Sequence, residues 1–190
     1  MYLINELIAL LAVNLILMQA LGTSTLFIAA DNRRNLVGTA LVITFFTTAG
    51  SAAAYGINSA LPEKYSDLTL LFYTLTVGIL YLLLLTLMYF ISGERFRDIR
   101  KYIHVSAFNC AVMGTLFTVS GNAAEDPELN TLGSFVWAGA KAGIGFIIAA
   151  LILTAAYRKL NSAKVPASFR GFPAMLVYLG IISMAVYSLK

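Results

Sequence analysis

Charge is scarce in this sequence. Only 12% of its 190 residues are Asp, Glu, Lys or Arg, whereas 59% are hydrophobic, and the mean hydropathy is +0.82. A soluble domain carries about 25% charged residues. The shortage therefore excludes a soluble domain and predicts an all-α integral membrane protein.

Cysteine is almost absent as well. The single thiol, that of Cys110, excludes an internal disulfide framework and any metal site built from several cysteines of this chain alone. A thiolate is a soft ligand suited to iron–sulfur chemistry. If Cys110 binds a metal, the other ligands must come from other chains. The alternative is a small buried hydrophobic residue, as free cysteine often is.

The motifs of nucleotide and hydrolytic chemistry are missing too. The sequence contains no Gly-rich phosphate loop, no Ser–His–Asp set and no paired-carboxylate site, which argues against nucleotide chemistry within this chain. The stretch from Met1 to Glu6 lacks the basic region of a signal peptide. We therefore expect the first apolar segment to be a permanent span.

Long apolar runs are what the sequence has instead. A membrane span needs about 20 residues at about 1.5 Å per residue. Six segments are long enough, namely 3–30, 36–60, 68–92, 103–123, 132–157 and 172–189. The connections between them, such as the basic stretch 93–101, are short and polar. We predict six transmembrane helices in one membrane domain covering residues 1–190.

Lysine and arginine are distributed unevenly among the connections. Ten of them follow odd-numbered spans, and only Lys64 and Lys190 lie on the other side. The ten are Arg33, Arg34, Arg95, Arg97, Arg100, Lys101, Arg158, Lys159, Lys164 and Arg170. Because basic short loops mark the cytoplasmic side, we expect a multi-pass inner-membrane protein with both termini outside. The net charge of +4 is then an orientation signal, and we expect no nucleic-acid partner.

Six spans divide into two sets of three that run in opposite senses. This is the geometry of an inverted repeat, whose best sequence pointer is a Gly-interrupted segment at corresponding places in both halves. Spans one and four fit, because Gln19–Thr25 contains Gly22 and Asn109–Gly114 ends in glycine. We expect a 3+3 inverted repeat, about 1–92 and 93–190, with broken helices one and four. Alternatively, these glycines only permit close helix packing.

The candidate site residues cluster at these two breaks. Cys110 is aimed at a shared interior site in this interpretation, and Asn109 either hydrogen-bonds freed backbone groups or joins helices. Ser24, at the corresponding break, either lines the same site or satisfies carbonyls of its own helix. Span two, rich in small residues, is predicted to form a tight helix contact.

Lys141 is the one strongly basic residue deep in a span. A charge near mid-depth is a functional hypothesis by default, here an ion path. The alternative is that its long side chain snorkels to the interface. Its acidic partner is not visible in the sequence, although Glu6 is one candidate.

Two stretches resemble motifs of a known family, the Rnf/Nqr membrane subunits. Residues 108–114 (Phe-Asn-Cys-Ala-Val-Met-Gly) resemble its N-C-A-V-L/M-G motif, and residues 165–171 (Val-Pro-Ala-Ser-Phe-Arg-Gly) resemble V-P-x-x-F/L-R-G before the last helix. Val13–Gly22 is similar to the first broken helix of that family. The similarity covers nearly the whole chain and is closest to the branch formed by the A subunit of Rnf and the E subunit of Nqr.

The resemblance implies a specific arrangement. In that family two homologous six-helix subunits pack in opposite orientations, and each contributes two cysteines to a shared 2Fe-2S cluster at mid-depth. Flavin and Fe–S subunits complete the complex, which couples electron flow to Na+ or H+ translocation. Cys110 matches the second family cysteine, whereas Ser24 stands in place of the first.

This replacement leaves three interpretations open. The cluster persists with altered ligation, the chain is a divergent paralogue with different metal occupancy, or the cysteine was removed by engineering. A hydroxyl is a harder and far less acidic ligand than a thiol, so the site is weakened or altered in each case.

The sequence thus predicts a membrane subunit of an ion-translocating Rnf/Nqr-like oxidoreductase complex. Its work would be electron transfer through a cluster shared with a homologous subunit, with Cys110 as the one plausible thiolate. The alternative from another class is a redox-silent transporter or ion-pathway subunit that uses the same broken helices, with Lys141 in the path. A third interpretation is a structural anchor for partners.

Overall fold

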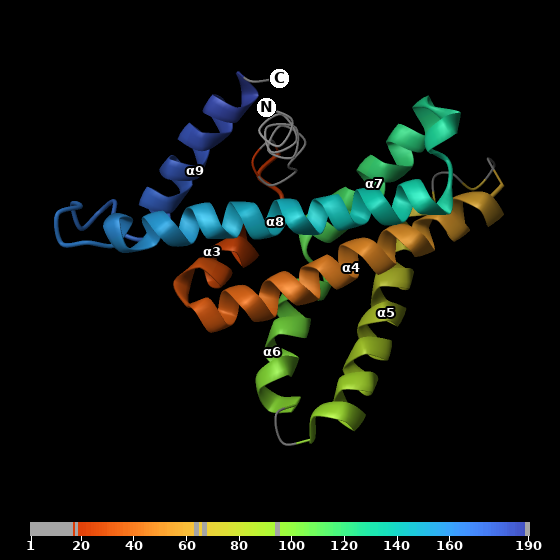
Figure 1. Ribbon diagram of the computed structural model, residues 1–190, viewed down its shortest axis with the longest axis horizontal. Coiled ribbons are helices and arrows are strands. Elements are labelled where there is room, and N and C mark those ends of the chain that lie inside the picture. The colour runs from red at the N-terminus through yellow and green to blue at the C-terminus, as the bar shows by residue number, and fades with distance from the viewer. Residues whose placement is uncertain (1–16, 18, 63–64, 66–67, 94–95, 189–190) are drawn as a thin grey trace.

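The computed structural model describes residues 17, 19–62, 65, 68–93 and 96–188, and within these ranges every regular element is a helix (Figure 1). In chain order the elements are α3 (Thr23–Asp31), α4 (Arg33–Ala60), α5 (Thr69–Ser92), α6 (Phe96–Ala107), α7 (Cys110–Glu125), the short 3-10 helix η3 (Pro127–Leu129), α8 (Leu132–Leu160) and α9 (Phe172–Tyr187). The all-α prediction is confirmed for the described part of the chain.

Among the residues that the structure describes, three helices are long and apolar enough to cross a membrane, namely Arg34–Ala60, Thr69–Ser92 and Leu132–Tyr157. They match predicted spans two, three and five. Helices α6 and α7 form a pair bent by 47° that makes a fourth crossing if it is one span. The apolar helix α9 is shorter, with 16 residues, and most of predicted span one lies outside the described residues.

The connection predicted at 93–101 is shorter than expected, because α6 already begins at Phe96. The buried and exposed side chains of α6 alternate with the helical period. Ile103, Ser106 and Ala107 are buried, whereas Arg97 and Lys101 are exposed. An amphipathic pattern of this kind lets a charged stretch continue as helix with its polar face outward.

Helices α4 and α8 run antiparallel and side by side through the centre of the molecule (Figure 1). Their contact is close because two glycines of α8 face α4. A Cβ atom at Gly139 would lie 2.7 Å from the Ser51 Oγ, and one at Gly143 would lie 2.7 Å from the Thr44 Oγ1. The prediction that span two forms a tight small-residue contact is therefore confirmed.

The remaining helices pack on both sides of the α4–α8 pair. Helix α3 contacts α8 and α4, and α7 contacts α4 and α8. Helix α5 packs on α4 and α9 packs on α8, and Figure 1 shows α5 and α9 leaving the pair in opposite directions.

The buried apolar side chains accordingly form two clusters. One includes Leu26, Ile43 and Phe146 and lies around α3 and α9, and the other includes Phe46 and Val112 and lies around α5, α6 and α7.

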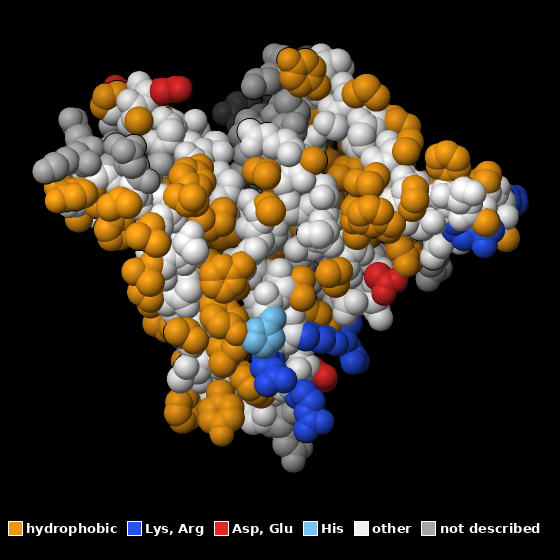
Figure 2. Space-filling view, turned by 180° about the vertical axis from the view of Figure 1, so that it is seen from behind, with side chains coloured by type: hydrophobic (Ala, Val, Ile, Leu, Met, Phe, Trp, Pro, Cys, Tyr) orange, Lys and Arg blue, Asp and Glu red, His pale blue; other side chains and the backbone are white. Residues whose placement is uncertain are grey.

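Charged side chains collect at the ends of this bundle. In Figure 2, Lys and Arg gather at the lower tip and the right-hand end, and none is visible at the upper left, where acidic side chains lie. The exposed basic residues of the described part include Arg97, Arg100 and Lys101 of α6, Lys159 in the last turn of α8, and Lys164 and Arg170 after α8. The acidic stretch Glu125–Glu128 is at the far end of α7. Apart from Lys141 of α8, the middle of the molecule is therefore the apolar part, as a membrane protein requires.

The glycine contact between α4 and α8 yields a stability prediction. Because a methyl group at position 139 overlaps α4 atoms, we expect Gly139→Ala to destabilise the protein by about 1–3 kcal/mol. The measurement is thermal unfolding in detergent. Gly133→Ala in the same helix is the control, since a Cβ there meets nothing within 4 Å. Equal unfolding temperatures for the two variants would contradict a tight α4–α8 contact.

Candidate functional site

The fourth apolar segment is interrupted at Phe108 and Asn109, between α6 and α7. Asn109 has an extended backbone (φ −88°, ψ 141°), and the N–H of Ala111 donates a hydrogen bond to its side-chain Oδ1 at 3.0 Å. The side chain thus caps α7 and satisfies one of the backbone donors that a helix start leaves free.

The break is narrower than the predicted run Asn109–Gly114, because helix resumes at Cys110 and includes Gly114. A Cβ at Gly114 would overlap the Leu21 side chain. Gly114 therefore permits close packing, which is the alternative given above for the glycines. The interruption of the helix itself lies at Asn109.

The first apolar segment is also interrupted. Leu17 and Gln19 are helical, the chain then leaves the helix, and α3 begins at Thr23. Ala20 (φ 55°) and Gly22 (φ 78°) both adopt the left-handed conformation that side chains disfavour. Ala20 is the only such non-glycine residue among those described, so the turn is held by its surroundings.

The two breaks lie against one another. Gly22 is buried, and a Cβ there would lie 2.8 Å from the Ala111 Cβ and 2.9 Å from the Asn109 Oδ1. Beside it, the Leu21 side chain fills the space that the missing Cβ of Gly114 leaves. The contact therefore brings the N-termini of α3 and α7 to one place.

Asn109 is the polar side chain at the centre of this contact. It is only 5% exposed, and its Nδ2 has no hydrogen-bond partner among the residues that the structure describes. That nitrogen would be 3.2 Å from a Cβ at Gly22, so it faces the other break. A buried amide with one half unsatisfied is costly, which marks this junction as a specialised feature rather than ordinary core.

Cys110 and Ser24 flank the junction at the surface of the chain. Cys110 is the first residue of α7 and Ser24 the second residue of α3, and both are exposed. The helices that follow the two breaks thus begin with an exposed thiol in α7 and an exposed hydroxyl in α3.

The described part of the chain does not hold a metal site of its own. No three His, Cys, Asp or Glu side chains come together there at a spacing that would bind a metal ion. A metal at Cys110 needs ligands from beyond these residues, as its single thiol already indicates.

The other predicted residues lie elsewhere. Lys141 is exposed on α8, with its Nζ 5.4 Å from the centre of the Trp137 ring. His104, on α6, has its Nδ1 2.7 Å from the Tyr81 hydroxyl.

Sequence reasoning missed one polar group, the triangle of Asn58, Tyr73 and Ser120, which joins α4, α5 and α7. Asn58 Nδ2 donates to Ser120 Oγ at 2.9 Å, and the buried Tyr73 hydroxyl donates to Asn58 Oδ1 at 2.7 Å. Its only signal in the sequence is polar residues within apolar segments.

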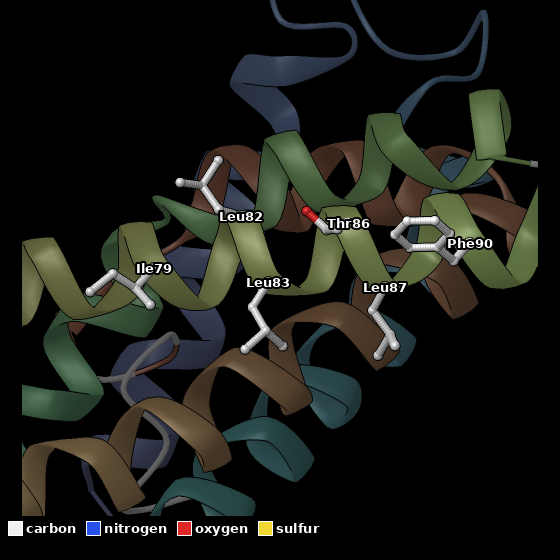
Figure 3. Close-up of a pocket in the computed structure, with 6 residues that line it drawn as sticks. All are labelled: Ile79, Leu82, Leu83, Thr86, Leu87 and Phe90. Carbon is white, nitrogen blue, oxygen red and sulfur yellow. The ribbon is translucent and has the colours of Figure 1, made fainter.

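A shallow groove on α5 carries no comparable chemistry. Figure 3 shows its lining, which comes from α5 alone and includes the exposed Leu82 and Phe90, with Thr86 as its one hydroxyl. An exposed apolar helix face suits contact with lipid tails.

Long apolar helices, a bent helix pair and a protein-buried interruption define a multi-pass membrane protein with irregular backbone inside its bundle. Comparison with known proteins then fixes the family. A family model described as "Rnf-Nqr subunit, membrane protein" matches residues 3–190, so the chain belongs to the Rnf-Nqr subunit family. The resemblance noted in the sequence is confirmed.

Individual relatives are distant but match over most of their length. The A subunit of the ion-translocating oxidoreductase complex of Shewanella piezotolerans is 25% identical over 174 residues, which cover 90% of this chain and 88% of the relative. The A subunit of the Na(+)-translocating ferredoxin:NAD(+) oxidoreductase complex of Acetobacterium woodii is 24% identical over 174 residues, with coverage of 90% and 88%.

The cap at the break yields a second prediction. We expect Asn109→Ala to lower the free energy of unfolding by about 1 kcal/mol because the Ala111 N–H loses its acceptor. Asn109→Ser should retain most of that stability, since serine also caps helices. Thermal unfolding in detergent compares the two. If both variants unfold at the same temperature as the wild type, the Asn109 side chain does not stabilise the break.

Proposed function

We propose that this chain is a membrane subunit of an ion-translocating oxidoreductase complex. Its family membership and the names of its relatives support this. The observation that carries the proposal is the junction of the two breaks, which presents Cys110 at the start of α7 and Ser24 at the start of α3 on the surface. A ligand pair on the surface suits a site that a second subunit completes.

The six-span inverted repeat is part of the proposal. Exchanging α3 with α7, α4 with α8 and α5 with α9 converts three of the observed helix contacts into three others that are also present. The pair α3–α8 becomes α7–α4, α3–α4 becomes α7–α8, and α4–α5 becomes α8–α9. This pairing of contacts supports two halves of about 1–92 and 93–190. The basic ends of the bundle would face the cytoplasm and both termini the outside.

We further propose that Cys110 contributes one thiolate to a 2Fe-2S cluster shared with a homologous six-helix subunit, with Ser24 beside it as a weaker oxygen ligand. The residues fit a shared cluster but not a self-contained one, because this chain offers one thiol and one hydroxyl, both exposed. When bound, the cluster would supply one-electron transfer at the depth of the breaks.

The residues of this chain would hold and shield that position. Cys110 would offer its sulfur from the first residue of α7. Asn109 fixes where α7 begins and therefore where the thiol lies. Leu21, packed on Gly114, closes the contact between the breaks with apolar atoms and so excludes water.

A redox-silent role in an ion pathway is the second candidate. The observation that favours it is Ser24, because a hydroxyl at this position leaves the chain with a single thiol. Broken helices present free backbone groups that bind ions in other transporters. The two candidate functions differ in whether the iron content of the complex depends on Cys110.

Iron and acid-labile sulfide, measured on the anaerobically purified complex, separate these roles. We expect Cys110→Ala to lower both by about two atoms per complex, since a 2Fe-2S cluster needs its thiolates. Ser24→Cys should retain iron at least as well as the wild type, because a thiolate is the softer ligand. Ser59→Ala, another exposed hydroxyl, is the control.

Equal iron in the wild type and Cys110→Ala would overturn the cluster role and favour the ion-pathway role. A wild-type chain that purifies without any other subunit would contradict membership of a complex.

A further inference from the structure

Lys141 lies on the outer side of α8, away from the central contact. At about 100° per residue, it is about 160° around the helix from both Gly139 and Gly143, which face α4. The side chains that share its face are exposed, with Trp137 59%, Ile144 39% and Leu151 53% exposed. The cation therefore belongs to the perimeter of this chain rather than to its core.

The depth of Lys141 places it within hydrocarbon. The span Leu132–Tyr157 has 26 residues, which is about 39 Å of helix. A hydrocarbon core of about 30 Å centred on this span puts the Lys141 Cα about 9 Å inside the nearer boundary. Trp137 is one turn closer to that boundary, with its Cα about 4 Å inside, and the Lys141 Nζ lies 5.4 Å from the centre of its ring.

The contact with the Trp137 ring is the only favourable electrostatic interaction that the described residues make with the Lys141 ammonium group. Its Nζ lies 5.4 Å from the Trp137 ring centre, and within residues 17, 19–62, 65, 68–93 and 96–188 no carboxylate forms an ion pair with it. Charged residues inside membranes face a partner or a polar cavity almost without exception.

We propose that the α8 face of Trp137, Lys141, Ile144 and Leu151 binds a transmembrane helix of another subunit, and that this helix carries an Asp or Glu that pairs with Lys141. The inference rests on the proposed membership of a multi-subunit complex. Tryptophan is enriched in the anchoring contacts of protein interfaces, and it holds the ammonium group on this face. The charge sets the chemistry of the partner, because only an anion inside the membrane offsets it.

The experiment uses the whole complex in native membranes. A photoreactive phenylalanine analogue at position 144 should crosslink to one protein of the complex, within a transmembrane peptide that contains Asp or Glu. The same analogue at Leu82, on the apolar face of α5, is the matched control and should crosslink to lipid.

Charge reversal then tests the ion pair. We expect Lys141→Glu to reduce recovery of the crosslinked subunit with the complex at least about tenfold, the scale of breaking a buried pair. Replacing the crosslinked carboxylate by Lys should restore recovery in Lys141→Glu. The neutral variant Lys141→Met, of similar shape, separates the loss of charge from failure to fold.

Three results would overturn the inference while leaving the proposed function intact. They are lipid crosslinks at position 144, full recovery of every subunit in Lys141→Glu, or the same loss in Glu6→Gln, which would place the acid within this chain. A wild-type chain that purifies free of other subunits would overturn both proposals.

Discussion

A helix interrupted inside hydrocarbon exposes N–H and C=O groups that no water can satisfy, so an interruption must be buried in protein. This chain meets that constraint by placing one break on the other. Gly22 has no Cβ, and the space this leaves is occupied by Asn109 and Ala111. Asn109 in turn caps the helix that follows it. Gly22 therefore leaves the room in which Asn109 caps α7.

The α4–α8 contact makes this junction possible. Gly139 and Gly143 let the two longest described helices approach until backbone and hydroxyl groups touch, and α3 and α7 are then laid across that pair. Because the α3 and α7 N-termini meet at the perimeter, Cys110 and Ser24 remain exposed. The two proposals, the shared cluster and the partner helix at Lys141, have one feature in common. In both, the functional groups of this chain face outward and depend on neighbouring subunits.

Much of this arrangement follows from local sequence. Apolar runs located the crossings at 34–60, 69–92 and 132–157, because length and hydropathy are local properties. The polar cluster around Asn109 located the break. The sequence could not assign the role of Gly114, because that role depends on Leu21 from a distant segment. It also could not predict the Asn58–Tyr73–Ser120 triangle, because three separate helices assemble it. The start of α6 was missed because charged residues on one helical face resemble a loop when counted without regard to period.

The central claim is that the two breaks meet at one depth and one place. It is tested most directly by the distance between spin labels on Cys110 and on a cysteine at Ser24→Cys, with the full chain in lipid nanodiscs. We predict strong dipolar broadening in the EPR spectrum, because the labelled residues flank one junction. A separation approaching the hydrocarbon thickness of about 30 Å would contradict the claim, since the breaks would then lie at opposite sides of the membrane.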